Sequence, residues 1–199
     1  MRGLFARAAL ATALAATPTA LQAANYSESS LGDISGTPAA PSTWLLEAGA
    51  NVLSGSAGTA SDFDILTFTV PVGHQLDSLF LDLFQNQGTP LSFLGLQSGS
   101  TWTTGLGGGV LAGDLLGYDI FSSSEVGTDR LPQIGFNGDS SGNPFTPPLP
   151  SGAYTMLLQD TFSTFSYQFT LNVSSVPEPA TFGLAALGLV GIVRLRMKR

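Results

Sequence analysis

Two acidic side chains at alternate positions are the first residues of this chain that could do chemistry. Asp62 and Asp64 flank Phe63 at the start of a strand-like segment, so their carboxylates lie on one face, about 6–7 Å apart. Oxygens at that spacing can bind calcium or, as a carboxylate pair, serve glycoside hydrolysis. The simplest interpretation is a polar strand start. Asp62 and Asp64 are therefore the candidate metal ligands, and the sequence assigns no cofactor beyond this calcium alternative.

The residues that usually make a hydrolytic or zinc site are scarce. The chain has no cysteine, and His74 is its single histidine. Catalytic zinc normally takes two or three histidines, and a Ser-His-Asp triad would have to use His74. This histidine follows the turn-like residues 71–73 and fits a solvated turn position. We therefore predict a protein that is not an enzyme and has no catalytic residues.

The charges are distributed very unevenly along the chain. Residues 24–176 hold 13 of the 14 acidic residues but only one of the seven basic residues, Arg130, which gives this segment a formal net charge of −12. Such a surface repels the phosphates of nucleic acids. It keeps an exported protein soluble or attracts divalent cations. As the sole cation among 13 acids, Arg130 is expected to pair with a nearby carboxylate; the alternative is a solvated arginine.

The first 23 residues have the three-part pattern of a secretory signal peptide. Arg2 and Arg7 precede a short apolar run over residues 8–16, and Ala23 supplies the small residue at the cleavage position. The apolar run is shorter than the roughly 20 residues that span a bilayer. We therefore predict export, with cleavage after Ala23.

The last 23 residues have the pattern of a short membrane anchor. Prolines at 177 and 179 interrupt secondary structure, because proline blocks the continuation of a helix. The uncharged segment 180–193 would make about 21 Å of helix, against a hydrocarbon core of about 30 Å. A basic tail closes the chain and suits the cytoplasmic side of an inner membrane. These features predict a marginal transmembrane helix over 180–193, with the main domain outside.

A Val-Pro-Glu-Pro motif, a short Gly/Ala/Leu helix and an Arg-rich tail in this order resemble the PEP-CTERM sorting signal. In that family an exosortase, a membrane-embedded transpeptidase-like enzyme, recognises the signal and cleaves near the motif. The matching positions are Pro177, Glu178, Pro179, the helix 180–193, Arg194, Arg196, Lys198 and Arg199. The sorting signal therefore covers residues 177–199.

The resemblance also implies where the protein goes and what it meets. The precursor would be anchored in the inner membrane, and the mature form would lie at the cell surface or in the extracellular matrix. Its partners would be the exosortase, the secretion machinery and, transiently, the inner membrane. The family further implies bacteria that make exopolysaccharide and biofilm.

The middle segment, residues 24–176, has the length of one domain and repeatedly shows the alternation of β-strands. In 167–173 apolar and polar side chains alternate, and residues 71–73 are expected to end the strand before them. No convincing helical period is present. Many short strands with Gly/Pro/Ser turns favour an all-β fold with a single β-sandwich. The predicted strands are 64–70, 79–84, 91–96, 115–121, 154–158 and 167–173, with edge pieces at 43–46 and 51–54.

Two stretches of this segment resemble bacterial pre-peptidase C-terminal domains. Residues 62–73 follow their D-x-D-x-(apolar)-x-F-x-V-x-x-G strand, and residues 149–155 are similar to the start of their later G-x-Y strand. The resemblance spans 62–172. It implies a jelly-roll-like β-sandwich rather than an activity.

The sequence thus predicts an exported, non-enzymatic bacterial protein of the cell envelope or extracellular matrix, associated with exopolysaccharide or biofilm. The alternative is a carbohydrate- or calcium-binding module of the cell surface. Trp44 and Trp102 would serve the carbohydrate alternative if their rings were exposed, although tryptophan more commonly packs in a core or at its rim.

Overall fold

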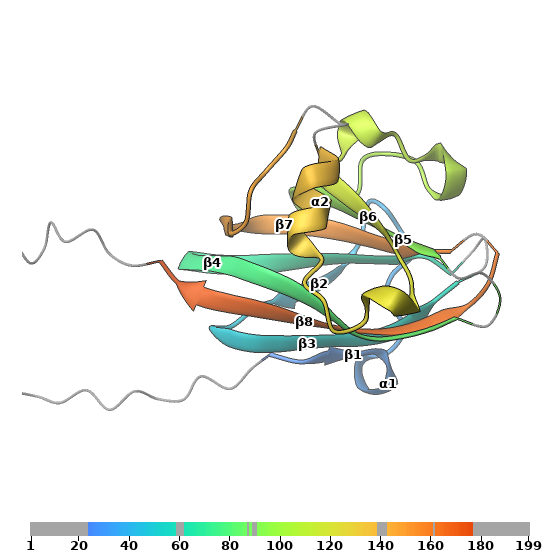
Figure 1. The fold of residues 1–199 in the computed structure, drawn as a ribbon, viewed down its shortest axis with the longest axis horizontal. Helices are drawn as coiled ribbons and strands as arrows, with labels where there is room; N and C mark the ends of the chain where they lie inside the picture. Colours follow the sequence, from blue (N-terminus) through green and yellow to red (C-terminus); the bar gives the residue numbers. More distant parts are fainter. Residues whose placement is uncertain are drawn as a thin grey trace, which may run out of the picture.

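The computed structural model describes residues 24–58, 62–86, 88, 91–138, 143–160 and 162–176, and strands dominate this part of the chain (Figure 1). The prediction of an all-β fold is confirmed. The expected signal peptide with its cleavage at Ala23, and the expected transmembrane helix over 180–193, lie outside the described residues. The strands are β1 (Tyr26–Ser27), β2 (Ser42–Leu45), β3 (Gly49–Ala57), β4 (Asp64–Asn86), β5 (Ser92–Ser98), β6 (Gly117–Phe121), β7 (Leu149–Gln159) and β8 (Phe165–Ser175).

The longest strand, β4, joins the two halves of the sheet. Its first half, 64–70, pairs with β2 and β7. Its second half, 74–86, pairs mainly with β8 and keeps β7 as a partner at Gln75 and Leu76. The strand order is β1-β3-β8-β4-β7-β5-β6, with β2 beside β4. The predicted strand end at 71–73 is wrong, because the pairing register shifts between Val70 and Gln75, and Gly73 adopts a φ of 78°. The chain therefore bends there without leaving the sheet.

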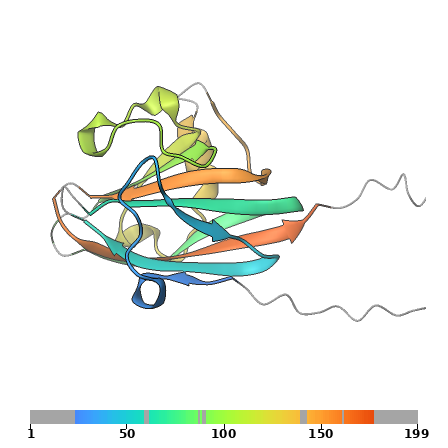
Figure 2. The same cartoon turned by 180° about the vertical axis from the view of Figure 1, so that it is seen from behind.

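The two halves of the sheet fold onto each other and enclose the core, as the views from the two sides show (Figures 1 and 2). Phe121 of β6 and Phe169 of β8 belong to different halves, yet their ring centroids are 5.7 Å apart. Tyr26 of β1 and Trp44 of β2 also meet across the halves, edge to face at 6.3 Å. Inner faces that touch in this way make a sandwich-like core.

The alternation predicted for 167–173 is confirmed in β8. Tyr167, Phe169, Leu171 and Val173 are all buried, whereas the residues between them are half-buried. β8 pairs with β3 along one edge and with β4 along the other, so its apolar face lies over the centre of the core.

The prediction that the middle segment has no helix is wrong, because several short helices are present. Helix α2 (Leu131–Asn137) begins with a proline in its first turn and buries Leu131 and Ile134. Its seven residues make only two turns, too few to show a helical period in the sequence. The other helical pieces of the described residues are α1 (Glu28–Leu31), η1 (Gly107–Gly109), η2 (Ala112–Asp114) and η3 (Ser123–Glu125).

Replacing Phe169 by alanine is expected to lower the free energy of unfolding by about 3–5 kcal/mol, because a fully buried ring would leave a cavity. Urea denaturation of the exported protein measures the change. The control is Ser166→Ala, an exposed position of the same strand, where the effect should stay within about 0.5 kcal/mol. Equal midpoints for the two variants would contradict the placement of β8.

Candidate functional site

Three carboxylates from separate segments meet beside the start of β4. One oxygen each from Glu28, Asp33 and Asp64 lies within 4.8 Å of the other two. Glu28 begins α1, Asp33 lies in the loop that follows, and Asp64 is the first residue of β4. The backbone N–H of Ile65 donates to the carbonyl of Ser35 at 2.9 Å, which holds that loop against β4. We call these three acidic residues the acidic cluster.

Asp64 is the buried member of the acidic cluster, with 0% of its surface exposed. Its Oδ2 accepts a 2.6 Å hydrogen bond from the Tyr167 hydroxyl, whereas its Oδ1 has no hydrogen-bond partner among the described residues. Burial raises the pKa of Asp64 to about 8; the Tyr167 hydroxyl opposes this shift, and the charges of Glu28, Asp62 and Asp33 add to it. Without a cation, this carboxyl group therefore holds a proton at neutral pH.

Glu28 is fixed by the backbone around it. Its Oε2 accepts from the N–H of Ser56 at 2.7 Å, and its Oε1 accepts from the N–H of Ile34 at 3.3 Å. Burial raises the pKa of Glu28, and these two backbone hydrogen bonds counter part of the rise. Gly55 provides the space, since a Cβ there would lie 2.7 Å from both the Glu28 Cδ and the Tyr167 hydroxyl oxygen.

The structure separates the two metal ligands predicted from the sequence. Asp64 belongs to the acidic cluster, whereas Asp62 lies outside the three converging oxygens and pairs through its backbone with Gly58. Burial and the charge of Asp33 raise the pKa of Asp62. Asp62 therefore interacts with the cluster through its charge, although it does not belong to it. Sequence reasoning missed Glu28 and Asp33, which precede Asp64 by 36 and 31 residues and share no motif spacing with it.

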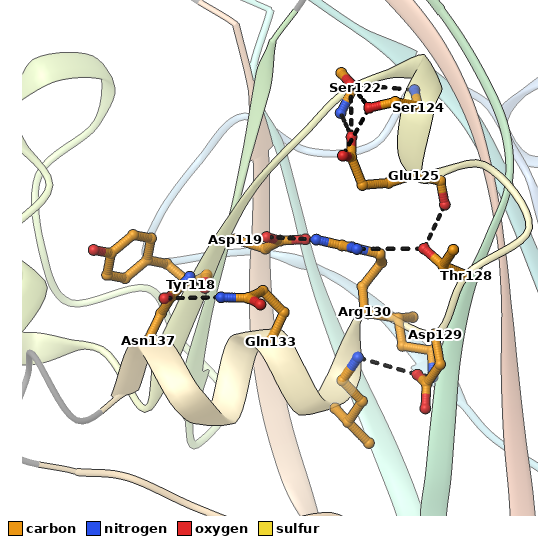
Figure 3. Close-up of polar contacts among 12 residues, drawn as sticks. Tyr118, Asp119, Ser122, Ser124, Glu125, Thr128, Asp129, Arg130, Gln133 and Asn137 are labelled. Carbon is orange, nitrogen blue, oxygen red and sulfur yellow. Dashed lines mark hydrogen bonds and ion pairs between the residues drawn. The ribbon is translucent and has the colours of Figure 1, made fainter.

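The single basic residue of segment 24–176 is already paired (Figure 3). The Nε and Nη2 of Arg130 donate to Oδ2 and Oδ1 of Asp119 in β6, at 2.7 and 3.0 Å. The two side chains are 13% and 2% exposed. The hydrogen bond from Arg130 to Asp119 raises the pKa of the guanidinium. The prediction that Arg130 pairs with a nearby carboxylate is confirmed.

Two local motifs hold the loop that carries Arg130, as Figure 3 shows. Ser122 and Glu125 form a capping box at η3, in which the Ser122 N–H donates to Glu125 at 2.7 Å. The Ser122 hydroxyl donates to the same carboxylate and lowers the pKa of Glu125. The Oδ1 of Asp129 accepts from the N–H groups of Leu79 and Leu131, at 2.8 and 3.1 Å. These hydrogen bonds fix the loop and thereby position Arg130 beside Asp119.

The tryptophans do not form a carbohydrate site. Trp44 and Trp102 are 7% and 3% exposed, so neither ring can stack on a sugar. A hollow of about 520 Å³ beside β5 and β6 is lined mostly by apolar side chains. Gln159 at this hollow accepts from the Gly107 N–H and donates to the Gly107 carbonyl, which occupies both polar atoms of its amide.

Two features that could suggest catalysis lie in unsuitable places. His74 lies at the bend of β4, where its Nδ1 is 3.2 Å from the Val72 carbonyl. The spacing G-x-S-x-G occurs at residues 138–142, directly after α2. A nucleophile elbow follows a strand and opens a helix, so the element that precedes this spacing is of the wrong kind. Residues 139–142 themselves lie outside the described residues.

The last described strand, β8, ends just before the predicted cleavage motif. Ser175 is the last residue of β8 and pairs with His74, and the N–H of Val176 donates to the Gly73 carbonyl at 2.8 Å. Pro177, Glu178, Pro179 and the basic tail lie beyond the described part of the chain. Within the described part, no helix is both long and apolar enough to cross a bilayer.

Residues 175–199 match the family model of the PEP-CTERM protein-sorting motif. This match confirms the predicted sorting motif. It implies exosortase-dependent sorting of an exported protein, with an exosortase as the processing partner. The comparisons with curated proteins and with solved structures gave no match. The jelly-roll topology and the likeness to pre-peptidase C-terminal domains stay predictions.

Replacing Arg130 by glutamine is expected to lower the free energy of unfolding by about 3–5 kcal/mol, because Asp119 would stay buried without its partner. Urea denaturation at neutral pH measures the loss. The double variant Arg130→Gln/Asp119→Asn removes both charges and should lose less. A loss of about 1 kcal/mol or less for the single variant would match an exposed ion pair instead.

In a chelating buffer, the stability of the domain is expected to fall as the pH rises from about 4 to about 8. The unfolded Asp64 loses its proton near pH 4, whereas the folded Asp64 holds it to about pH 8, so the unfolded state is favoured as the pH rises. Asp64→Asn should flatten this dependence, and exposed Asp114→Asn should not. Thermal melts over this pH range measure it, and parallel curves for both variants would contradict the assignment to Asp64.

Proposed function

We propose that residues 24–176 are the folded cargo of the exosortase-dependent route and act without catalysis in the cell envelope or extracellular matrix. The observation that carries this proposal is the position at which β8 ends. β8 finishes at Ser175, and Val176 is held by a backbone hydrogen bond to Gly73. Cleavage within 177–179 would therefore release the domain with all of its described strands, β1 to β8.

The physical properties of the tail suit a transient anchor. Segment 180–193 is shorter than a bilayer requires, and the basic tail would keep its end on the cytoplasmic side. Pro177 and Pro179 favour an extended backbone, the form in which a processing enzyme can reach a peptide bond. The precursor would thus present its cleavage motif between β8 and the membrane.

The domain itself favours a binding or structural role over catalysis. Its single histidine lies at the bend of β4. Among the described residues, Asp119 is the only buried carboxylate that forms an ion pair, and its partner is Arg130. Association with exopolysaccharide or biofilm belongs to this proposal. Of the two binding alternatives, the acidic cluster favours calcium over carbohydrate, since both tryptophans are buried.

The test is mass spectrometry of the exported protein from cells with and without the exosortase. We expect a mature chain that begins near Ala24 and ends between Val176 and Pro179. In cells without the enzyme, the full C-terminus should persist in the membrane fraction. An intact Arg199 on the secreted protein of wild-type cells would contradict the processing, and turnover of a glycan or peptide that is lost in Asp62→Asn or Asp64→Asn would contradict the non-enzymatic role.

A further inference from the structure

The acidic cluster has no counterion on the domain. Arg130 is the single basic residue between positions 24 and 176, and it is bonded to Asp119 in β6. Glu28, Asp33 and Asp64 therefore converge within 4.8 Å of one another without a lysine or arginine between them. Like charges at this separation repel one another, and the repulsion grows where water is excluded.

A second, independent observation comes from the buried side of the cluster. Asp64 is fully buried, and its Oδ1 has no hydrogen-bond partner in the described part of the chain. Buried polar atoms nearly always have a partner, and one that lacks it points to a missing ion or water. The Tyr167 hydroxyl holds the other oxygen at 2.6 Å, so the carboxylate cannot turn to satisfy Oδ1 without losing this bond.

The geometry favours calcium among the divalent cations. Calcium binds oxygen at about 2.3–2.6 Å, so two ligands on opposite sides of the ion are about 4.6–5.2 Å apart. The three oxygens of the cluster lie within 4.8 Å of one another, so all three can reach one calcium ion. Magnesium, at about 2.0–2.1 Å, requires closer and more regular ligands and keeps more of its water. Zinc prefers nitrogen and sulfur ligands, and none is present in the cluster.

The cluster has a fixed, less exposed side, at Glu28 and Asp64, and an exposed side, at Asp33. Backbone N–H groups of Ile34 and Ser56 fix the Glu28 carboxylate, and Gly55 leaves the space that a Cβ would fill. Asp33 is exposed, so the ion can enter there and keep water molecules as further ligands.

We propose that Glu28, Asp33 and Asp64 bind a calcium ion that fastens the N-terminal segment to the start of β4. Ile34 is the only buried residue between positions 28 and 41, so the ion would add to the backbone hydrogen bond from Ile65 to Ser35 that holds this segment. Extracellular calcium-binding modules have dissociation constants of about 10⁻⁴–10⁻³ M. The link would therefore close after export, where calcium reaches such concentrations.

The test uses the exported protein, prepared in a chelator and then titrated with calcium chloride or magnesium chloride. We expect calcium to raise the melting temperature in a concentration-dependent way, and magnesium at the same concentration to do so much less. Calorimetry should give one calcium per chain. A melting temperature that does not respond to calcium would overturn the proposal.

The informative variant is Asp33→Asn, because an exposed side chain can be changed without disturbing the core. It should melt like the parent in chelator but bind calcium about tenfold more weakly or worse. The matched control is Asp114→Asn, which removes one exposed carboxylate outside the cluster and should leave calcium binding unchanged. Equal loss of affinity in both variants would assign the effect to net charge and overturn the site.

Terbium luminescence gives a readout that does not depend on stability. Terbium replaces calcium at oxygen sites, and Tyr167 lies in hydrogen-bond contact with Asp64, close enough to transfer excitation energy to the ion. Asp64→Asn preserves an acceptor for the Tyr167 hydroxyl and should abolish the signal, whereas calcium should displace terbium from the parent. Persistence of the signal in this variant would place the ion elsewhere. The proposal rests on the proposed function only because export would supply the calcium. If mass spectrometry showed no cleavage at the C-terminus, the binding measurements would still test the site.

Discussion

The hydrogen bonds of β4 are the constraint on which both halves of the sheet depend. One strand of 23 residues pairs with β2 and β7 along its first half and with β8 along its second half. Gly73, at a φ of 78°, and the register shift beside it let the strand bend between the two halves. The inner faces then converge, and Phe121 meets Phe169 across the core. Loss of this bend would separate the apolar faces that stabilise the domain.

The same strand separates the two features that bear on function. Asp64 begins β4 and belongs to the acidic cluster, whereas the bend at Gly73 bonds to Val176, the last described residue before the cleavage motif. The extended first half of β4, residues 64–70, measures about 20 Å, so the two places lie at opposite ends of it. Processing at the C-terminus and ion binding at the N-terminal segment would therefore occur without steric interference.

Because basic residues are scarce, one buried acidic side chain is paired with a cation and another is not. Asp119 is buried and receives both donors of Arg130. Asp64 is buried equally well but receives only the Tyr167 hydroxyl, and burial raises its pKa to about 8. A domain with one cation and 13 acids cannot pair every carboxylate that its fold brings together. Exposed carboxylates are solvated by water, but a buried one such as Asp64 needs a proton or an ion from solution.

Local patterns predicted those parts of the fold that depend on neighbours in the sequence. The alternation in 167–173 identified the buried face of β8, because a strand places every second side chain on the same face. The residues 71–73 looked like a strand end, since proline and glycine usually interrupt strands. Their continuation inside β4 depends on β7 and β8, whose pairing with β4 spans up to about a hundred residues of sequence. The two turns of α2 are too short to show a period.

The sequence by itself determined the sorting motif, the all-β class and the excess of acid, because these follow from residue order and composition. It also indicated that Arg130 would find a carboxylate, since acids surround it in number, but it did not identify Asp119. Only the tertiary structure decided that Trp44 and Trp102 are buried and that Glu28 and Asp33 join Asp64. Those outcomes depend on which strands pair and on how β4 bends. Contacts between residues 31 to 36 positions apart leave no local spacing from which they could be inferred.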